Sequence, residues 1–390
     1  MPKKINIPFH KPEIDKDLFR IMKDSIESGW LTTGPKVTQF ESILKEYLNA
    51  KHVIALNSCT AALHIALLAK NVKKGDKVIV PTYTFVATSE VLEYIGAEPI
   101  FVDSELNTFN IDINQVEYIL KKDSSIKGII PVHFAGQSIN MDSLIKLKEK
   151  FDLFVIEDCA HALETVSSIG KVGDTSDFAA FSFYANKNIT TGGEGGALST
   201  NNSKLAEKAR ILSLHGMSKD GWKRFKNGNK WQYDVEDLGY KYNMTDISAS
   251  FGLSQLKRLE EWSKRRLNIV KKYNQSFSKI EGMITPNNYS NSFHAWHLYI
   301  IRVKPEFWKI DRSKLINLIN EKGIGTSVHY KPIHMHTYYI KKYGFSKKDF
   351  PNSYELSNTV ITLPLYPKLT NDEIDYIISS IEEIWKKNKI

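Results

Sequence analysis

Short apolar stretches alternate with helical patterns between about residues 50 and 183, and this alternation constrains the fold more than any other feature. The helical patterns include residues 60–70 and residues 86–95. The apolar stretches, each expected to be a strand, are residues 52–56, 77–81, 99–103, 128–134, 153–158 and 178–183. Apolar strands interleaved with helices form a mostly parallel sheet that is covered on both faces. The sequence therefore predicts a large α/β domain, which we assign to residues 1–250.

The pattern changes after about residue 245. Residues 246–277 predict one long amphipathic helix, because Ile247, Phe251, Leu253, Leu256 and Leu259 recur at near-helical spacing. Beyond this helix, we expect a strand over residues 296–303 and helices over residues 312–323 and 371–390. These elements predict a smaller α+β domain over residues 251–390.

Composition limits the classes of function. The chain has 53 Lys and Arg residues against 44 Asp and Glu residues, a net charge of +9, which favours anionic ligands. The lysines are spread along the chain, so no nucleic-acid partner is expected. No apolar run is long enough for a membrane span, and the N-terminal lysines precede no apolar stretch of the secretory type. Together with the two widely separated cysteines, this predicts a cytoplasmic protein with no disulfide framework and no metal site.

A polar turn follows the first expected strand. Asn57, Ser58 and Thr60 stand where the next helix begins, and their side chains suit helix capping. The free N–H groups of the same helix end could also hold a phosphate. Capping is the simpler interpretation of this motif taken alone.

Two acids end the strand expected at residues 153–158. Glu157 and Asp158 follow four apolar residues, and His161 comes three positions after Asp158. A carboxylate in this place is partly desolvated and needs a cationic partner. That partner could be a protonated pyridine nitrogen or the cation of a structural ion pair. Metal binding is the weaker interpretation, because a convincing third ligand is missing.

Lys187 lies 29 residues after Asp158, between a buried strand and the glycine-rich stretch "TTGGEGG". A Walker loop places its lysine after the glycines, and a dinucleotide fingerprint lies between a strand and a helix. Neither description fits this stretch, so the glycines indicate backbone freedom around a reactive amine. A helix-end phosphate site, an acid at a strand end and a lysine together predict pyridoxal phosphate as cofactor.

Nine stretches, in order along almost the whole chain, carry a family resemblance: residues 29–35, 57–64, 81–103, 131–137, 156–162, 181–196, 238–249, 294–299 and 323–330. In these stretches the chain resembles the DegT/DnrJ/EryC1/StrS family of sugar aminotransferases. The resemblance implies the type I fold of pyridoxal-phosphate-dependent transferases and a homodimer with shared active sites.

The resemblance also implies roles for individual residues. Lys187 would form the Schiff base and shuttle protons, Asp158 would pair with the pyridinium nitrogen, and His161 would lie beside the ring. Phe85 would stack on the ring, although a core phenylalanine is the simpler interpretation. The phosphate would be held by Ser58, Cys59, Thr60 and Ser182. Residues implied at the substrate or at the neighbouring subunit's site are Thr33, Lys241, Asn243, His329 and Tyr330.

The implied reaction moves an amino group from an amino acid, in this family usually L-glutamate, to a ketone on a nucleotide-linked sugar. A UDP- or dTDP-linked 4-keto-6-deoxy sugar is expected; a 3-keto sugar nucleotide, a cyclitol ketone and a non-catalytic regulator are the alternatives. Lys223 and Arg224 belong to a basic stretch, residues 218–231, whose aromatic residues suit a nucleobase. A solvated surface loop is the other interpretation of that stretch. Three departures from the family pattern are Cys59 in place of a common glycine, the extra glycine of "TTGGEGG", and "GYKYNM" for the common "GYNYRM".

Overall fold

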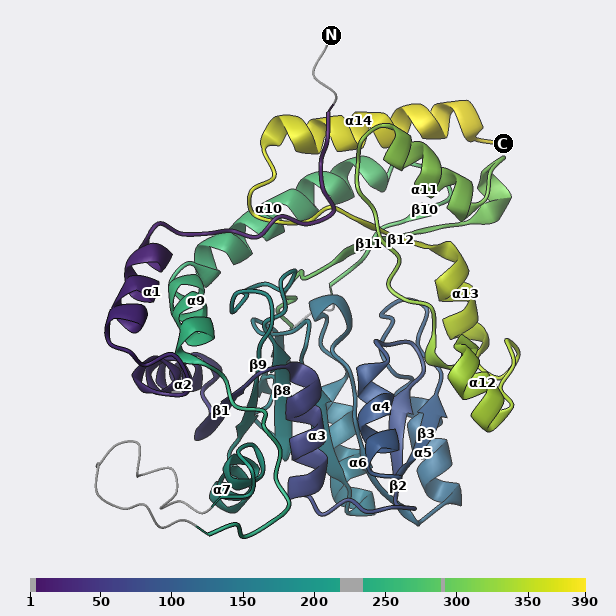
Figure 1. The fold of residues 1–390 in the computed structure, drawn as a ribbon. Helices are drawn as coiled ribbons and strands as arrows, with labels where there is room; N and C mark the ends of the chain where they lie inside the picture. Colours follow the sequence, from purple (N-terminus) through teal and green to yellow (C-terminus); the bar gives the residue numbers. More distant parts are fainter. Residues whose placement is uncertain (1–4, 218–233, 289–291) are drawn as a thin grey trace.

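A seven-stranded sheet forms the centre of the molecule (Figure 1). The computed structural model describes residues 5–217, 234–288 and 292–390. The strand order is β1-β9-β8-β5-β4-β2-β3, and the strands from β8 to β3 are all parallel. Strand β9 runs antiparallel to both β1 and β8. The strands are β1 (His52–Leu56), β2 (Lys77–Pro81), β3 (Glu98–Val102), β4 (Ile126–Ile129), β5 (Phe154–Asp158), β8 (Phe178–Ser182) and β9 (Gly196–Thr200). The expected mostly parallel α/β sheet is confirmed.

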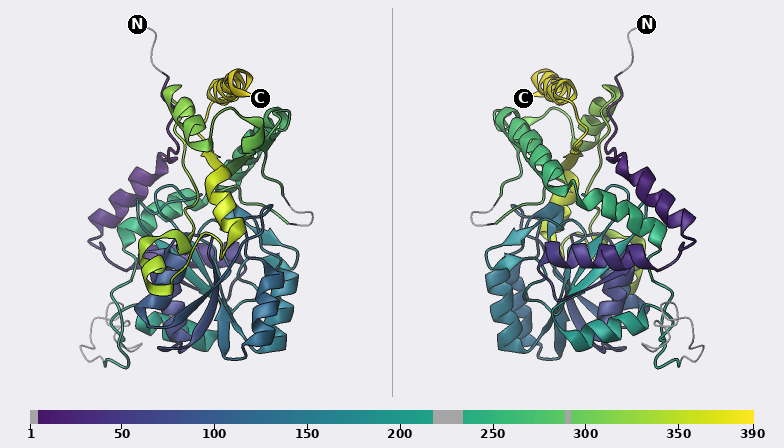
Figure 2. Two further views of the ribbon diagram at one scale, coloured as in Figure 1. Left: turned by 90° about the vertical axis from the view of Figure 1, so that its right-hand side faces the viewer. Right: turned by 90° about the vertical axis from the view of Figure 1, so that its left-hand side faces the viewer.

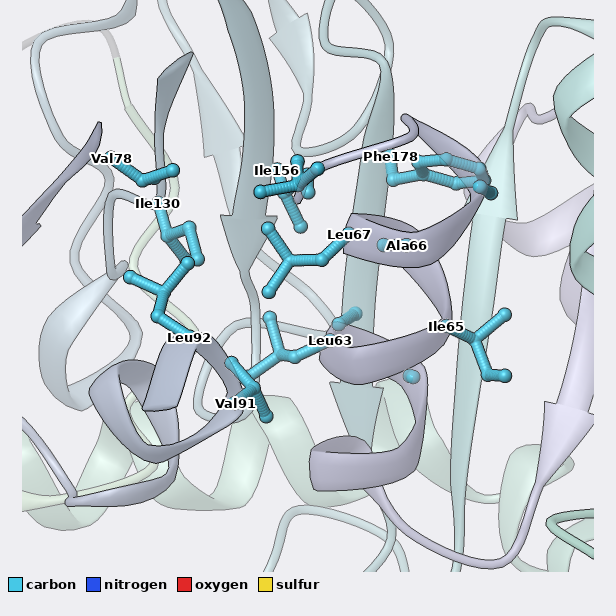
Figure 3. Close-up of a cluster of buried hydrophobic side chains, with 14 of the residues drawn as sticks. Leu63, Ile65, Ala66, Leu67, Val78, Val91, Leu92, Ile130, Ile156 and Phe178 are labelled. Carbon is cyan, nitrogen blue, oxygen red and sulfur yellow. The ribbon is translucent and has the colours of Figure 1, made fainter. Parts of the chain in front are cut away.

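Helices cover both faces of this sheet, as the alternation of its side chains requires. Val78 and Val80 pack in the core on the side of α3, whereas Ile79 between them packs in the core beside α5 and α6. Figure 3 shows the first of these cores, in which Leu67 of α3 lies beside Ile156 of β5 and Leu63 lies beside Val91. The helices of this part are α1 (Asp17–Glu27), α2 (Pro35–Leu48), α3 (Cys59–Ala69), α4 (Ala87–Tyr94), α5 (Ile113–Lys122), α6 (Met141–Phe151) and α7 (Ser203–Leu212).

The strand expected over residues 128–134 is shorter than its apolar run. Strand β4 ends at Ile129, and Phe134–Gly136 forms a 3₁₀ turn, η1. Pro131 has no N–H group with which to continue the ladder, so the regular strand stops before it, although Val132 still forms a parallel bridge with Asp158 of β5. The chain thereby reaches Ala135, whose backbone contacts the candidate site described below. A two-stranded ribbon, β6 (Val166–Ser167) and β7 (Gly170–Lys171), follows β5.

The single helix expected over residues 246–277 is wrong; two helices occupy this range. Helix α9 (Asp246–Leu256) packs on α1 and α2, whereas α10 (Leu259–Phe277) packs on α14. The chain breaks between them at Lys257 and Arg258, and the Arg258 guanidinium binds Asp15 and Glu261. The two halves bury their apolar side chains against different partners, and one straight helix could not contact both of these partners.

The C-terminal part has its own core, formed mainly by residues 269–384 with Ile7 from the N-terminal segment. The side views in Figure 2 show most of these elements, green to yellow, beyond one end of the large sheet, whereas the helix over residues 337–343 lies beside the sheet. They are β10 (Met283–Ile284), β11 (Tyr299–Val303), η2 (Pro305–Phe307), α11 (Arg312–Glu321), η3 (Ile333–Met335), α12 (Thr337–Tyr343), α13 (Pro351–Thr359), β12 (Val360–Leu363) and α14 (Asn371–Asn388). Ile333, Tyr339 and Phe350 return to the core of the large sheet. A division of the chain between residues 250 and 251 is our proposal. Among the described residues, no helix has both the length and the apolar character needed to cross a membrane.

Candidate functional site

Asp158 is the last residue of β5, and its carboxylate is buried. Thr88 Oγ1 donates a hydrogen bond to Asp158 Oδ2 over 2.8 Å, and the Ala160 N–H donates to Oδ1 over 3.1 Å. Burial raises the pKa of Asp158, while these two hydrogen bonds and the charge of Lys187 oppose the rise. The site thus contains a desolvated acid that a cationic partner would stabilise.

Glu157, the neighbouring acid, is engaged elsewhere. Its carboxylate accepts hydrogen bonds from the Gly173 N–H over 3.0 Å and from His133 Nε2 over 2.7 Å. The side chains of Glu157 and His133 are both fully buried. The two acids at the end of β5 therefore have different partners: Glu157 binds the buried His133, whereas Asp158 interacts with the charge of Lys187.

Lys187 lies in the turn after β8, where its backbone N–H donates to the Tyr184 carbonyl over 2.9 Å. Burial lowers the pKa of Lys187 to about 8, against the opposing influence of Cys59 and Asp158. Because Lys187 and Asp158 shift each other's pKa, the structure brings the two expected residues into one cluster. An amine with such a pKa is a nucleophile and a base near neutral pH.

Two separate structural requirements explain the glycines after Lys187. Gly192 and Gly193 have φ values of +87° and +120°, which L side chains rarely adopt, so the extra glycine of this turn fits its backbone. Gly196 pairs with Ser182 across β8 and β9, and a Cβ on Gly196 would lie 2.4 Å from the Ser58 carbonyl carbon. Glycine at position 196 therefore lets the sheet approach the start of α3 closely.

The residues expected at a phosphate lie where the sheet approaches the start of α3. Ser58 caps α3, because its Oγ accepts the Ala61 N–H over 3.0 Å. The N–H groups of Cys59 and Thr60 lie in the first turn, where a helix has no internal acceptor for them. Ser182 pairs with Gly196 in the sheet, and Gly196 in turn lies against the backbone of Ser58. Capping by Ser58 is thus confirmed, and it leaves the helix end open to an anion.

His161 and Tyr330 form a second side of the site. The Ala135 N–H donates to His161 Nδ1 over 3.1 Å, and Nε2 lies 3.1 Å from the Tyr330 hydroxyl. Burial and the charge of Lys187 hold the pKa of His161 well below its usual range, so the ring is neutral. Because Nδ1 accepts, the proton is on Nε2, which donates to Tyr330.

Tyr330 and His329 are fixed by a buried tyrosine. Tyr83 donates its hydroxyl hydrogen to the His329 carbonyl over 2.6 Å and accepts the Tyr330 N–H over 2.9 Å. His329 Nδ1 lies 2.8 Å from Thr362 Oγ1. Phe85, by contrast, is 57% exposed, and its ring centroid lies 6.1 Å from that of Tyr330. The interpretation of Phe85 as a core residue is therefore wrong.

Thr33, Lys241 and Asn243 form a separate group. Asn243 Nδ2 donates to Thr33 Oγ1, and Lys241 Nζ donates to Asn243 Oδ1, each over 2.6 Å. The three residues line a hollow with Trp30 and Leu214, among others. Lys223 and Arg224 lie outside the described residues.

Sequence reasoning missed four further residues around the site: Thr88, Glu164, Asn188 and His297. Each was inside or beside a stretch that carries the family resemblance, yet none has a local pattern that sets it apart. They are brought to the site by contacts between distant parts of the chain, such as the Asn188 contact with His297 over 3.1 Å.

The fold and the site together define the class of type I aminotransferase-like proteins. The features of this class are a mostly parallel sheet, a buried acid, a lysine of lowered pKa and an open helix end. Residues 12–382 match the model of the DegT/DnrJ/EryC1/StrS aminotransferase family, and the chain belongs to that family. The resemblance found in the sequence is confirmed, and the aminotransferases of this family use pyridoxal phosphate.

Similar proteins cover almost the whole chain. The spore coat polysaccharide biosynthesis protein SpsC of Bacillus subtilis is 44% identical over 381 residues, 97% of each chain. The putative sugar aminotransferase Spr1654 of Streptococcus pneumoniae, in its pyridoxamine-phosphate (PMP) form, is 35% identical with a TM-score of 0.89, covering 98% of this chain and 100% of that one. PseC of Helicobacter pylori, an aminotransferase involved in the biosynthesis of pseudoaminic acid, is 27% identical with a TM-score of 0.90, covering 98% and 100% of the two chains.

Proposed function

We propose that this protein is a pyridoxal-phosphate-dependent aminotransferase that moves an amino group from an amino acid to the keto group of a nucleotide-linked sugar. The observation that carries the proposal is the cluster of Lys187, with its pKa of about 8, and the buried Asp158. The putative sugar aminotransferase Spr1654 and PseC, an aminotransferase involved in pseudoaminic acid biosynthesis, support a sugar as acceptor. SpsC supports a place in polysaccharide biosynthesis.

The residues present fit pyridoxal phosphate. The cofactor's phosphate would be held by the N–H groups of Cys59 and Thr60 and by the hydroxyls of Ser58 and Ser182, at a place where Gly196 leaves room. Asp158 would accept a hydrogen bond from the protonated pyridine nitrogen, a cation that would stabilise this buried carboxylate. The cofactor would supply an electron-withdrawing ring and an aldehyde carbon that takes the amino group from the donor and passes it to the acceptor.

The protein's own residues would then orient and move protons. Lys187, neutral above pH 8, would take a proton from the reacting carbon of the amino donor and return one to the sugar carbon. His161, with its proton on Nε2, would fix the Tyr330 hydroxyl as an acceptor and leave the hydroxyl hydrogen of Tyr330 free to donate. Phe85 would supply an aromatic face that is exposed in the single chain.

We infer that two copies share their active sites. Trp30 lines the same hollow as Thr33, Lys241 and Asn243, and Leu31 and Leu238, which lie near these residues in the sequence, are exposed. Large apolar side chains left exposed beside such a hollow favour a protein partner. In the dimer, Lys241 and Asn243 would reach the other copy's site, and Lys223 with Arg224 would contact the diphosphate of a UDP- or dTDP-linked 4-keto-6-deoxy sugar, with His329 and Tyr330 near the sugar.

The test begins with the purified protein and added pyridoxal phosphate. We expect a yellow protein, and borohydride should attach the cofactor to Lys187, as read by peptide mass spectrometry. Incubation with L-glutamate should convert the bound cofactor to its amine form with release of 2-oxoglutarate. A protein that gains no visible absorbance from the cofactor would contradict the proposal.

The acceptor is tested next, with the amine form of the protein. Mass spectrometry would compare UDP-, dTDP- and GDP-linked keto sugars, with 3-keto sugars and cyclitol ketones as competitors. We expect a 4-amino sugar nucleotide as product. Amination of a cyclitol alone, or of no ketone at all, would contradict the proposed acceptor without affecting the cofactor result. Analytical ultracentrifugation of the same sample tests the dimer, which a monomer at micromolar concentration would contradict.

A further inference from the structure

A buried ion pair lies close to the turn that contains Lys187. Glu164 is in the loop after β5, and Arg266 is on α10; both side chains are 3% exposed. Arg266 Nη2 donates to Glu164 Oε1. The charge of Arg266 opposes the rise that burial causes in the pKa of Glu164. Because Arg266 binds Oε1, the second oxygen of Glu164, Oε2, is left to accept another hydrogen bond.

Asn188, the residue after Lys187, donates a hydrogen bond to that second oxygen. Its Nδ2 donates both to Glu164 Oε2 and, over 3.0 Å, to the Ala295 carbonyl. Neither partner has a hydrogen to give, since an ionised carboxylate and a carbonyl only accept. The orientation of the Asn188 amide is thus determined by its surroundings, and Oδ1 is left to act as an acceptor.

The acceptor on Asn188 decides the tautomer of His297. His297 Nδ1 lies 3.1 Å from Asn188 Oδ1, so Nδ1 carries a proton and donates it. Burial, together with the charge of Lys187, holds the pKa of His297 well below its usual range, so the ring has only this one proton. Its Nε2 therefore carries a lone pair.

His297 and His161 are adjacent rings of opposite tautomer. Their centroids lie 4.5 Å apart, but His161 has its proton on Nε2, because its Nδ1 accepts the Ala135 N–H. The two rings thus present different groups at the site, a donor from His161 and an acceptor from His297. His297 and Lys187 line the same cavity, together with Asn188 and Arg266.

We propose that Glu164, Asn188 and His297 form a positioning chain that presents the unprotonated Nε2 of His297 as a hydrogen-bond acceptor to the Lys187 amine. The chain would hold the amine in place whenever Lys187 is not bound to the cofactor. Arg266 anchors the chain from α10, so the long helix of the C-terminal part contributes to the position of the lysine. The inference rests on the proposed role of Lys187, but its tests use the apoprotein and need no catalysis.

The first test reads the tautomers directly. Long-range ¹H–¹⁵N spectra of apoprotein with ¹⁵N-labelled histidine distinguish a protonated Nδ1 from a protonated Nε2. His297→Gln and His161→Gln variants assign the two rings. We expect the proton on Nδ1 in His297 and on Nε2 in His161, which serves as the internal reference. A proton on Nε2 of His297, or a doubly protonated ring at pH 7, would overturn the proposal.

The second test asks whether Lys187 uses the acceptor. In the apoprotein, the reaction of Lys187 with an amine-specific reagent is followed against pH by peptide mass spectrometry. His297→Gln keeps an acceptor oxygen near the position of Nε2, whereas His297→Leu removes it. A hydrogen bond from the ammonium favours the charged form, so its loss in His297→Leu should lower the midpoint by about one pH unit.

His297→Gln should retain the wild-type midpoint, and so should His52→Leu, a histidine substitution on β1 outside this cavity. Thermal unfolding of each variant checks the fold. Equal midpoints in folded His297→Leu and wild-type protein would overturn the proposal; if His297→Leu does not fold, the tautomer of the wild-type ring still decides it. A protein that binds no pyridoxal phosphate but has the expected tautomers would contradict the proposed function and leave the chain of hydrogen bonds intact.

Discussion

Thr88 donates a hydrogen bond to Asp158 across 2.8 Å, although 70 positions separate the two residues in the sequence. Thr88 is in the first turns of α4, after β2, and Asp158 ends β5. Both are buried. A hydrogen bond to a carboxylate favours its charged form, so Thr88 opposes the effect of burial on the acid that would hold the cofactor ring.

The contribution of Thr88 is tested by Thr88→Val, which keeps the shape of the side chain and removes the hydroxyl. We expect the pKa of Asp158 to rise and the affinity for pyridoxal phosphate to fall by about tenfold, the value of a hydrogen bond to a charged group. Titration of the apoprotein with cofactor measures this. Thr88→Ser retains the hydroxyl and should bind like the wild type; equal affinities of Thr88→Val and the wild type would show that the hydroxyl has no such effect.

The lowered pKa of Lys187 predicts the pH dependence of cofactor capture. Only the neutral amine reacts with an aldehyde, and its fraction rises about tenfold per pH unit below the pKa. The rate at which apoprotein takes up pyridoxal phosphate should therefore rise with pH and level off above about 8. Stopped-flow absorbance measures the rate, with free lysine as the reference reaction. A rate that continues to rise up to pH 10.5, the ordinary value, would contradict the lowered pKa.

Gly196→Ala tests the contact between the sheet and α3. The added Cβ would lie 2.4 Å from the Ser58 carbonyl carbon and 2.5 Å from the Cys59 nitrogen, so backbone must move. We expect a loss of about 1–3 kcal/mol in the free energy of unfolding and a weaker affinity for pyridoxal phosphate. Urea unfolding and cofactor titration measure the two effects.

Gly75→Ala is the matched control, because a Cβ there meets nothing within 4 Å while φ is +86°. Its backbone strain should lower the free energy of unfolding by about 1–2 kcal/mol and leave cofactor affinity unchanged. If Gly196→Ala binds the cofactor as well as Gly75→Ala does, the start of α3 is not the phosphate site.

The buried pair of Glu164 and Arg266 should be costly to break on one side. Arg266→Met leaves the Glu164 carboxylate without its cation and should lower the free energy of unfolding by about 3–5 kcal/mol. The double variant Glu164→Gln/Arg266→Met removes both charges and should recover much of the loss. Urea unfolding of the wild type, both single variants and the double variant gives the coupling energy. Additive losses would mean that the two side chains do not interact.

Local patterns were sufficient for most of the fold. Strands β1 and β2 have the bounds expected from their apolar runs, because both are buried on two faces and so read as continuous apolar stretches. The patterns failed where a distant contact overruled them. Residues 246–277 are helical in sequence, yet α9 and α10 separate because one packs on α1 and α2 and the other on α14.

The candidate site divides in the same way. The sequence by itself indicated the candidate residues, since Asp158 ends a strand and Lys187 and the polar start of α3 each follow one, at the edge where the ends of parallel strands meet. Only the tertiary structure decided their surroundings: Thr88 on Asp158, Gly196 against Ser58, and the Glu164, Asn188 and His297 contacts beside Lys187. The strand order β1-β9-β8-β5-β4-β2-β3 brings these partners together. That order depends on packing between residues far apart in the chain, and a local sequence pattern does not contain this information.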